Sequence, residues 1–71
     1  MREHDARKGF GRVLRTLRTS KEMGLRELAT KAKVPPGYLA ELEAGKKKNP
    51  SLDVLKRLAR ALGVPVAELL E

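Results

Sequence analysis

Apolar residues recur along this chain with the three- and four-residue spacing of amphipathic helices. One such stripe runs through Phe10, Val13, Leu14 and Leu17 and predicts a first helix that ends near Lys21. The same spacing predicts helices over residues 25–32, 36–44 and 52–62, and a last turn or short helix over 66–70. There is no strand pattern and no internal repeat, so the predicted fold class is all-α, with five short helices.

The residues between these stripes are typical helix boundaries. Ser51 is a favoured N-cap, Gly24 a weaker one, and Pro36 suits the first position of a helix. Gly45 and Gly63 are expected to end helices in the left-handed conformation. Residues 1–8 have no apolar periodicity. We therefore predict a flexible basic arm over residues 1–8 and a single domain over residues 9–71.

The charge balance of the chain indicates what kind of partner it binds. The 71 residues include 16 Lys and Arg against nine Asp and Glu, a formal charge of +7. Residues 1–35 hold ten of the basic and four of the acidic residues. This favours a polyanionic partner, although the highly charged surface of a thermophilic protein is an alternative.

Several function classes are disfavoured. The only His lies in the arm, and no nucleophile–base pair, phosphate-binding glycine loop or metal-ligand cluster is present, so we predict no enzyme, cofactor or small-molecule substrate. No apolar run is long enough for a membrane span or a signal peptide. Together with the absence of Cys, this predicts a cytoplasmic location.

Residues 24–45 have the pattern of a helix-turn-helix. The small Ala29 permits a steep crossing of two helices, and Val34 follows at the turn. Leu39 and Leu42 then supply an inner face for the second helix. An ordinary helical hairpin could show this spacing by chance. On a basic chain, however, the unit typically places its second helix in the DNA major groove.

With its flanking motifs, the chain resembles the Cro/C1-type (XRE family) helix-turn-helix DNA-binding domain. The matching motifs are Phe10-Gly11-x-x-Leu14-Arg15-x-Leu17-Arg18, Leu28-Ala29, Tyr38-Leu39-x-x-Leu42-Glu43-x-Gly45, Asn49-Pro50-Ser51-Leu52 and Leu58-Ala59-x-Ala61-Leu62-Gly63-Val64. The resemblance covers residues 10–70 and implies a compact, five-helix, lambda-repressor-like domain.

The resemblance also implies roles for individual residues. Arg18 and Glu43 occupy the positions of an ion pair between the first and third helices. The residues implied in DNA binding lie at the start of the second helix, along the third helix and in the loop after it: Gly24, Leu25, Arg26, Pro36, Gly37, Tyr38, Ala40, Glu41, Lys46, Lys47 and Lys48. Gly24 and Leu25 would offer backbone N–H groups to a phosphate, and the three lysines would contact the sugar–phosphate backbone.

The chain departs from the family pattern where bases would be read. Leu25 stands where the family often has Gln, and Lys33 where it often has Gly, at a cost of roughly 1 kcal/mol in the left-handed conformation. The third helix has no Arg, Lys, Asn or Gln on its DNA-facing side. Glu41 could accept from cytosine N4, and Ala40 or Tyr38 could touch a thymine methyl. Tyr38 could instead contact a phosphate or pack against the loop that leads to the fourth helix.

Three interpretations of this departure stay open. DNA shape could decide the site, Arg2, Arg7 and Lys8 could enter a minor groove, or the fold could bind protein instead of DNA. The favoured function is a transcriptional regulator that binds double-stranded DNA at a two-fold-related operator. A homodimer would use Val64, Val66, Leu69 and Leu70; alternatively, the chain is the N-terminal part of a longer protein. The rival function is an antitoxin-like or adaptor module that binds protein.

Overall fold

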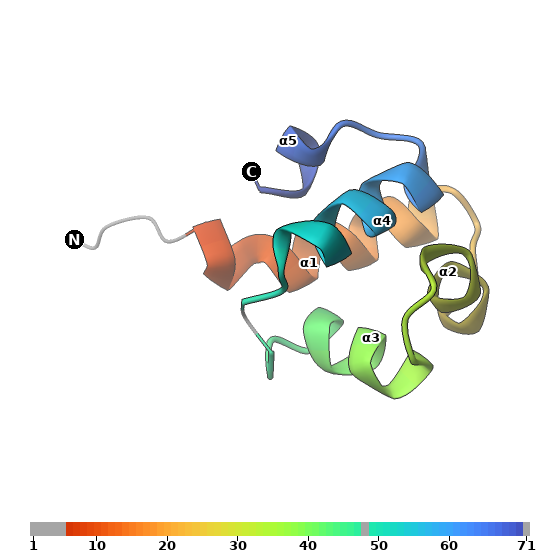
Figure 1. The fold of residues 1–71 in the computed structure, drawn as a ribbon, viewed down its shortest axis with the longest axis horizontal. Coiled ribbons are helices and arrows are strands. Elements are labelled where there is room, and N and C mark those ends of the chain that lie inside the picture. Colours follow the sequence, from red (N-terminus) through yellow and green to blue (C-terminus); the bar gives the residue numbers. More distant parts are fainter. Residues whose placement is uncertain (1–5, 48, 71) are drawn as a thin grey trace.

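The computed structural model describes residues 6–47 and 49–70, which form five α-helices (Figure 1). These are α1 (Ala6–Ser20), α2 (Leu25–Ala32), α3 (Pro36–Glu43), α4 (Leu52–Leu62) and α5 (Val66–Leu69). Helix α3 lies along the lower edge of Figure 1, with α2 at its right-hand end and α5 at the top. No strand occurs in these two ranges, and the predicted all-α class is confirmed.

Helix α1 starts earlier than the apolar pattern predicts. It begins at Ala6, so residues 6–8 of the expected arm belong to the helix. Ala, Arg and Lys are good helix formers, and this propensity extends the helix beyond the point where apolar periodicity begins. Residues 1–5, including Arg2, lie outside the described ranges.

The other boundaries follow the predicted capping residues. The Ser51 side-chain oxygen accepts a hydrogen bond from the Val54 amide at 3.1 Å, which satisfies one of the free N–H groups in the first turn of α4. Helix α3 begins at Pro36. Gly45 and Gly63 have positive φ values of 82° and 73°, in the region that glycine adopts without a steric penalty.

The core contains at least one fully buried leucine from every helix. Leu14, Leu28, Leu39, Leu58 and Leu69 each have 0% exposure. Full burial of a leucine side chain contributes about 1.5–3 kcal/mol through the hydrophobic effect. Because α3 places both Leu39 and Leu42 in this core, its orientation is fixed on its inner side.

The turn between α2 and α3 has the geometry of a helix-turn-helix. Ala29 is fully buried, and its carbonyl oxygen accepts a hydrogen bond from the Val34 amide at 3.0 Å. Lys33 takes the left-handed conformation, with φ 60° and ψ 46°. The Arg57 Nη1 of α4 donates to the Lys33 carbonyl oxygen at 2.8 Å, so α4 is connected directly to this turn.

Candidate nucleic-acid interface

The outer face of α3 is small and nearly free of hydrogen-bonding groups. Gly37, Ala40 and Glu41 are exposed, whereas Pro36 and Tyr38 are half-buried. Tyr38 packs partly against the core cluster. Of these five side chains, only Glu41 carries a charge, so α3 presents one carboxylate on an otherwise smooth face.

A bidentate ion pair between α1 and α3 holds the outer face of α3 in place. Arg18 Nε lies 2.7 Å from Glu43 Oε2, and Arg18 Nη2 lies 3.0 Å from Glu43 Oε1. Arg18 Nη1 also donates to the Met23 carbonyl oxygen at 2.8 Å. The two side chains retain only 12% and 7% of their exposure. A planar guanidinium with three such contacts fixes the angle between the two helices.

The same contacts affect the ionisation of Arg18. The hydrogen bond to Glu43 raises the pKa of Arg18 above its ordinary value, and the Coulombic attraction of that carboxylate adds to the effect. Partial burial acts in the opposite direction without reversing the shift. Arg18 is therefore charged under all ordinary conditions.

The N-terminus of α2 lies next to the turn that follows α1. Gly24 precedes the helix in an extended conformation, and its N–H donates to Glu27 Oε1 at 3.4 Å. Arg26 is exposed, while Leu25 is half-buried and packs against the core. Leu25 can thus offer a phosphate its backbone N–H and no polar side chain.

The lysine loop after α3 is tied to the end of that helix. The amides of Lys46 and Lys47 both donate to the Glu41 carbonyl oxygen, at 2.9 and 3.3 Å. Both side chains are exposed. This leaves two ammonium groups beside the outer face of α3. Lys48, the third lysine expected there, lies outside the described residues.

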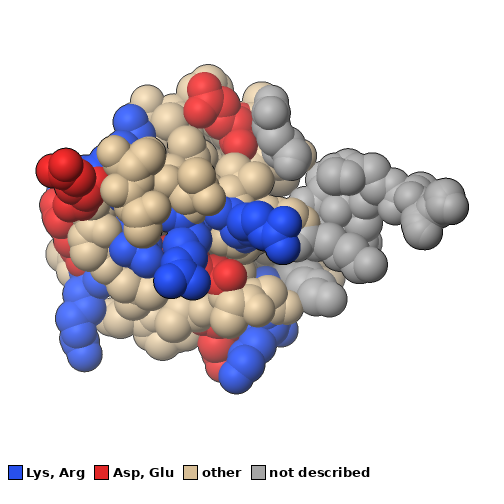
Figure 2. Space-filling model, turned by 180° about the vertical axis from the view of Figure 1, so that it is seen from behind, with Lys and Arg blue, Asp and Glu red and all other residues tan. Residues whose placement is uncertain are grey.

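Positive charge is not confined to the α3 face. Figure 2 shows the molecule from behind, where basic side chains gather across the middle of the face and recur along its lower margin. In α1, Arg12 and Arg15 are exposed. The net charge therefore attracts polyanions in general, and the geometry of α2, α3 and the lysine loop must provide any orientation.

One member of the expected dimer surface belongs to the core. Leu69 is fully buried, because the single turn of α5 directs it against the other helices, so its side chain offers no free surface for an interface. Leu70 is 42% exposed, and Val64 and Val66 are half-buried. The apolar surface at this end of the chain is correspondingly smaller than the sequence indicates.

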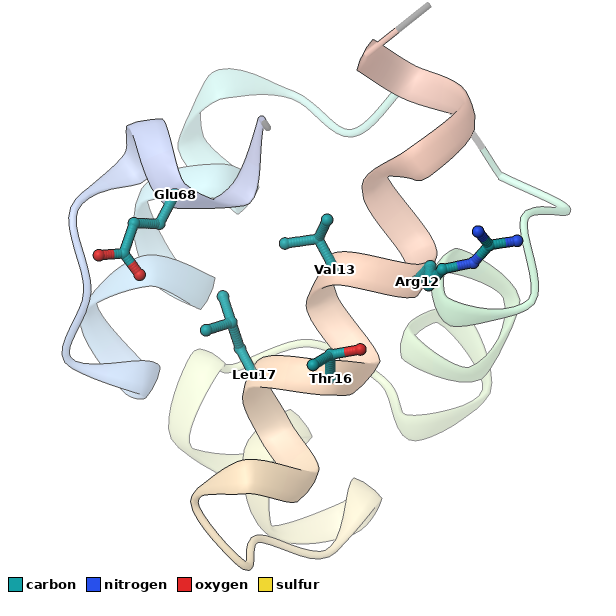
Figure 3. A pocket seen from close by; sticks show the side chains of 5 residues that line it. All are labelled: Arg12, Val13, Thr16, Leu17 and Glu68. Carbon is teal, nitrogen blue, oxygen red and sulfur yellow. The ribbon is translucent and has the colours of Figure 1, made fainter.

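A hollow of about 470 Å³ lies between α1 and α5. It is lined by Arg12, Val13, Thr16, Leu17 and Glu68. Figure 3 shows Val13 and Leu17 pointing from α1 toward α5, while Arg12 points away to the other side of α1. The hollow thus has an apolar floor with charged groups at its margins.

The described part of the chain has no group of three or more His, Cys, Asp or Glu side chains placed to hold a metal ion. None of its helices is long and apolar enough to cross a membrane.

Two residues important for the geometry were missed or undervalued in the sequence. Gly11 is buried where α1 meets α3, although the sequence marks it only as part of a matching motif. Arg57 connects α4 to the turn. In the sequence, the only sign of a role for Arg57 is Asp53 four residues before it; the structure pairs the two at 3.1 Å. A contact between Arg57 and a backbone carbonyl 24 residues away has no signature in a single sequence.

Comparison with known proteins places the chain in a family. A helix-turn-helix family profile matches residues 14–69. The transcriptional regulator ClgR of Mycobacterium tuberculosis is 41% identical over 64 residues, which are 90% of this chain and 56% of that protein. This chain thus spans little more than half the length of that regulator.

Solved structures agree with this assignment. The clp gene regulator ClgR from Corynebacterium glutamicum is 43% identical with a TM-score of 0.86, covering 97% of this chain and 72% of that one. The biofilm master regulator SinR, solved in complex with DNA, is 35% identical with a TM-score of 0.84 over 87% of this chain and 98% of that one. The chain belongs to the Cro/C1-type (XRE) helix-turn-helix family.

Proposed function

We propose that this chain is the DNA-binding part of a transcriptional regulator, with α3 in the major groove. The observation that carries the proposal is its likeness to SinR, a regulator solved in complex with DNA, at 35% identity and a TM-score of 0.84. The arrangement of charge supports it: the N-terminus of α2 and the exposed Lys46 and Lys47 flank α3. These groups would hold phosphates on either side of the groove.

Base recognition on this surface would depend on few contacts. The Glu41 carboxylate can accept a hydrogen bond from cytosine N4, and the Ala40 methyl can contact a thymine methyl. The third helix offers no bidentate partner for guanine or adenine, so sequence-dependent DNA shape would carry much of the discrimination. Arg7 and Lys8, in the first turn of α1, and Arg2, which precedes the helix, would add minor-groove contacts.

We further propose that the protein binds a two-fold-related operator as a homodimer. The exposed Leu70 and the half-buried Val64 and Val66 offer apolar surface at this end of the chain, and a hollow lies between α1 and α5. Arg12 and Glu68, which carry opposite charges, are both among the residues that line that hollow. In a self-complementary two-fold interface, the Arg12 of one copy would pair with the Glu68 of the other.

Selection of binding sites from random duplex DNA at about 150 mM salt tests the DNA proposal. We expect an enriched, two-fold-related sequence whose half-sites lie about one helical turn apart. No enrichment, together with binding that disappears as salt rises, would leave only non-specific attraction and would contradict the proposal. If the selection enriches a single half-site, the proposal of DNA binding stands and the proposal of a dimer on the operator is contradicted.

The smooth face of α3 also favours a second candidate, a protein-interaction module on the same fold. Gly37 and Glu41 are exposed and Tyr38 is half-buried, a mixture that suits an antitoxin-like or adaptor contact as well as a groove. This function predicts weak, non-selective DNA binding and a protein partner on this face. Replacement of Glu41 by Ala would then disrupt the protein complex without altering the selected DNA sequences.

A further inference from the structure

A second cationic surface lies at the other end of α2. The C-terminus of α2, the turn after it and α4 enclose a hollow of about 180 Å³. It is lined by Lys31, Ala32, Lys33, Arg57 and Arg60, so four of its five lining residues are basic. The roles implied by the family resemblance include none of these five residues.

Hydrogen bonds and an ion pair fix Arg57 in place, while the other basic side chains are available to bind an anion. Arg57 is fixed by the Lys33 carbonyl oxygen at 2.8 Å and by Asp53 at 3.1 Å. Its Nε is buried without a hydrogen-bond partner in the described part of the chain, so the guanidinium is only partly satisfied. The ammonium of Lys31 lies 3.9 Å from Glu27, a loose and half-exposed contact.

Positive charge therefore exceeds negative charge around this hollow. Four basic residues line it, and two carboxylates stand against them: Glu27 contacts Lys31, and Asp53 contacts Arg57. The side chains of Lys31, Lys33 and Arg60 are exposed. Such a surface attracts anions, and Arg60 and Lys33 are the side chains best able to reach one.

The position and size of the hollow favour a protein as its occupant. The eight residues of α2 span about 12 Å, so the hollow lies that far from Gly24, where a DNA phosphate is expected. Its volume is below the roughly 300–1,000 Å³ of typical small-molecule sites. It suits the insertion of one or two carboxylate side chains.

We propose that this hollow, formed by Lys31, Lys33, Arg57 and Arg60, docks an acidic segment of a partner protein. The carboxylates pair with Arg60 and Lys33, while Arg57 shapes the floor and remains bound to the turn. This proposal does not rest on the DNA function, because it uses residues outside the surface of α3 and the lysine loop.

A short poly-glutamate peptide is the probe for this surface. Amide chemical shifts of the full chain, followed during titration, are expected to change most at Ala32, Lys33 and Arg60. Arg60→Gln and Lys33→Gln should each weaken the peptide affinity by about two- to fivefold, the usual effect of a single exposed ion pair. Lys56→Gln, which removes an exposed charge from α4 outside the hollow, is the matched control.

Three outcomes would overturn the proposal. The first is that the peptide changes the amide shifts of α1 and the lysine loop as strongly as those of the hollow. The second is that Lys56→Gln lowers the peptide affinity as much as Arg60→Gln does. The third concerns duplex DNA. If Arg60→Gln reduces DNA affinity as much as Lys47→Gln does, the hollow is part of the DNA-binding surface and has no separate acidic partner.

Discussion

Gly11 of α1 lies directly against the backbone carbonyl of Leu42 in α3. A Cβ added at Gly11 would collide with the Leu42 carbonyl oxygen and would lie 2.8 Å from that of Glu43. Neither of these backbone atoms can yield without moving α3. The close approach of the two helices therefore requires a residue without a side chain at position 11.

Replacement of Gly11 by Ala should reduce the free energy of unfolding by about 1–3 kcal/mol, the usual cost of overpacking. Denaturant unfolding measures the change. Gly9→Ala is the matched control, because nothing lies within 4 Å of a Cβ at that position of α1. It should stabilise the helix by about 0.5–1 kcal/mol. Equal effects of the two substitutions would show that the helices are not in close contact at Gly11.

Removal of one partner of the Arg18–Glu43 pair should be costly. Glu43→Gln leaves the Arg18 guanidinium poorly compensated in a site where it retains 12% exposure, and we expect a loss of about 3–5 kcal/mol. Arg18→Met combined with Glu43→Leu should recover much of this stability, because both charges are then absent. A double-mutant cycle measures the coupling, and a coupling near zero would contradict a structural role for the pair.

The raised pKa of Arg18 predicts how this stabilisation depends on pH. A base whose folded pKa lies above its unfolded value contributes stability fully below the unfolded pKa and loses it only as pH rises through the folded pKa. The ordinary pKa of an arginine is already strongly alkaline and that of Arg18 is raised further, so this window lies far above neutral pH. The difference in unfolding free energy between the native protein and Glu43→Gln should therefore stay constant from neutral pH to about pH 10. A steady decline over this range would contradict the prediction.

The left-handed conformation of Lys33 predicts a stabilising substitution. Lys33→Gly removes the steric cost of a Cβ at φ 60° in the folded state, but glycine also raises the conformational entropy of the unfolded chain. We expect the free energy of unfolding to rise by about 0.5–1 kcal/mol as the net effect. Glu22, with φ 57°, is a second test of the same effect. Thermal unfolding measures both. If Glu22→Gly stabilises and Lys33→Gly does not, the Lys33 side chain has a favourable contact of its own.

The lysine loop predicts a salt dependence of DNA binding. Lys46→Ala and Lys47→Ala should each reduce the slope of log affinity against log salt concentration by up to about 0.9, the value for one phosphate contact. Fluorescence anisotropy over a range of salt concentrations measures the slope. Lys56→Ala, which removes an equally exposed lysine from α4, should leave it nearly unchanged. If the slope is unchanged in the loop variants, Lys46 and Lys47 do not contact DNA phosphates.

Much of the fold follows from the sequence because its apolar spacing and its capping residues agree. Ser51, Pro36 and Gly63 each predict a boundary that the structure contains. The start of α1 at Ala6 was not predicted, because helix propensity without apolar periodicity leaves no pattern. The burial of Leu69 was missed for a related reason: one turn of helix is too short for periodicity to separate an inner from an outer face.

Less of the candidate site was predictable from the residues alone. The Arg18–Glu43 contact connects positions 25 residues apart, and only the family resemblance paired them. The contact of Arg57 with Lys33 depends on how α4 packs against α2, which composition and spacing do not specify. The small outer face of α3 was visible in the sequence, because Gly37, Ala40 and Glu41 can be assigned once the inner leucines are known.

Because its outer face is small, α3 can also accept substitutions that would give it a new binding preference. A Cβ at Gly37 would meet nothing within 4 Å, and Ala40 is exposed beside it. Longer side chains at these two positions would extend into solvent without disturbing Leu39 or Leu42. The chain thus separates the residues that hold α3 in place from those that could be exchanged, so the outer surface of α3 can be redesigned without rebuilding the core.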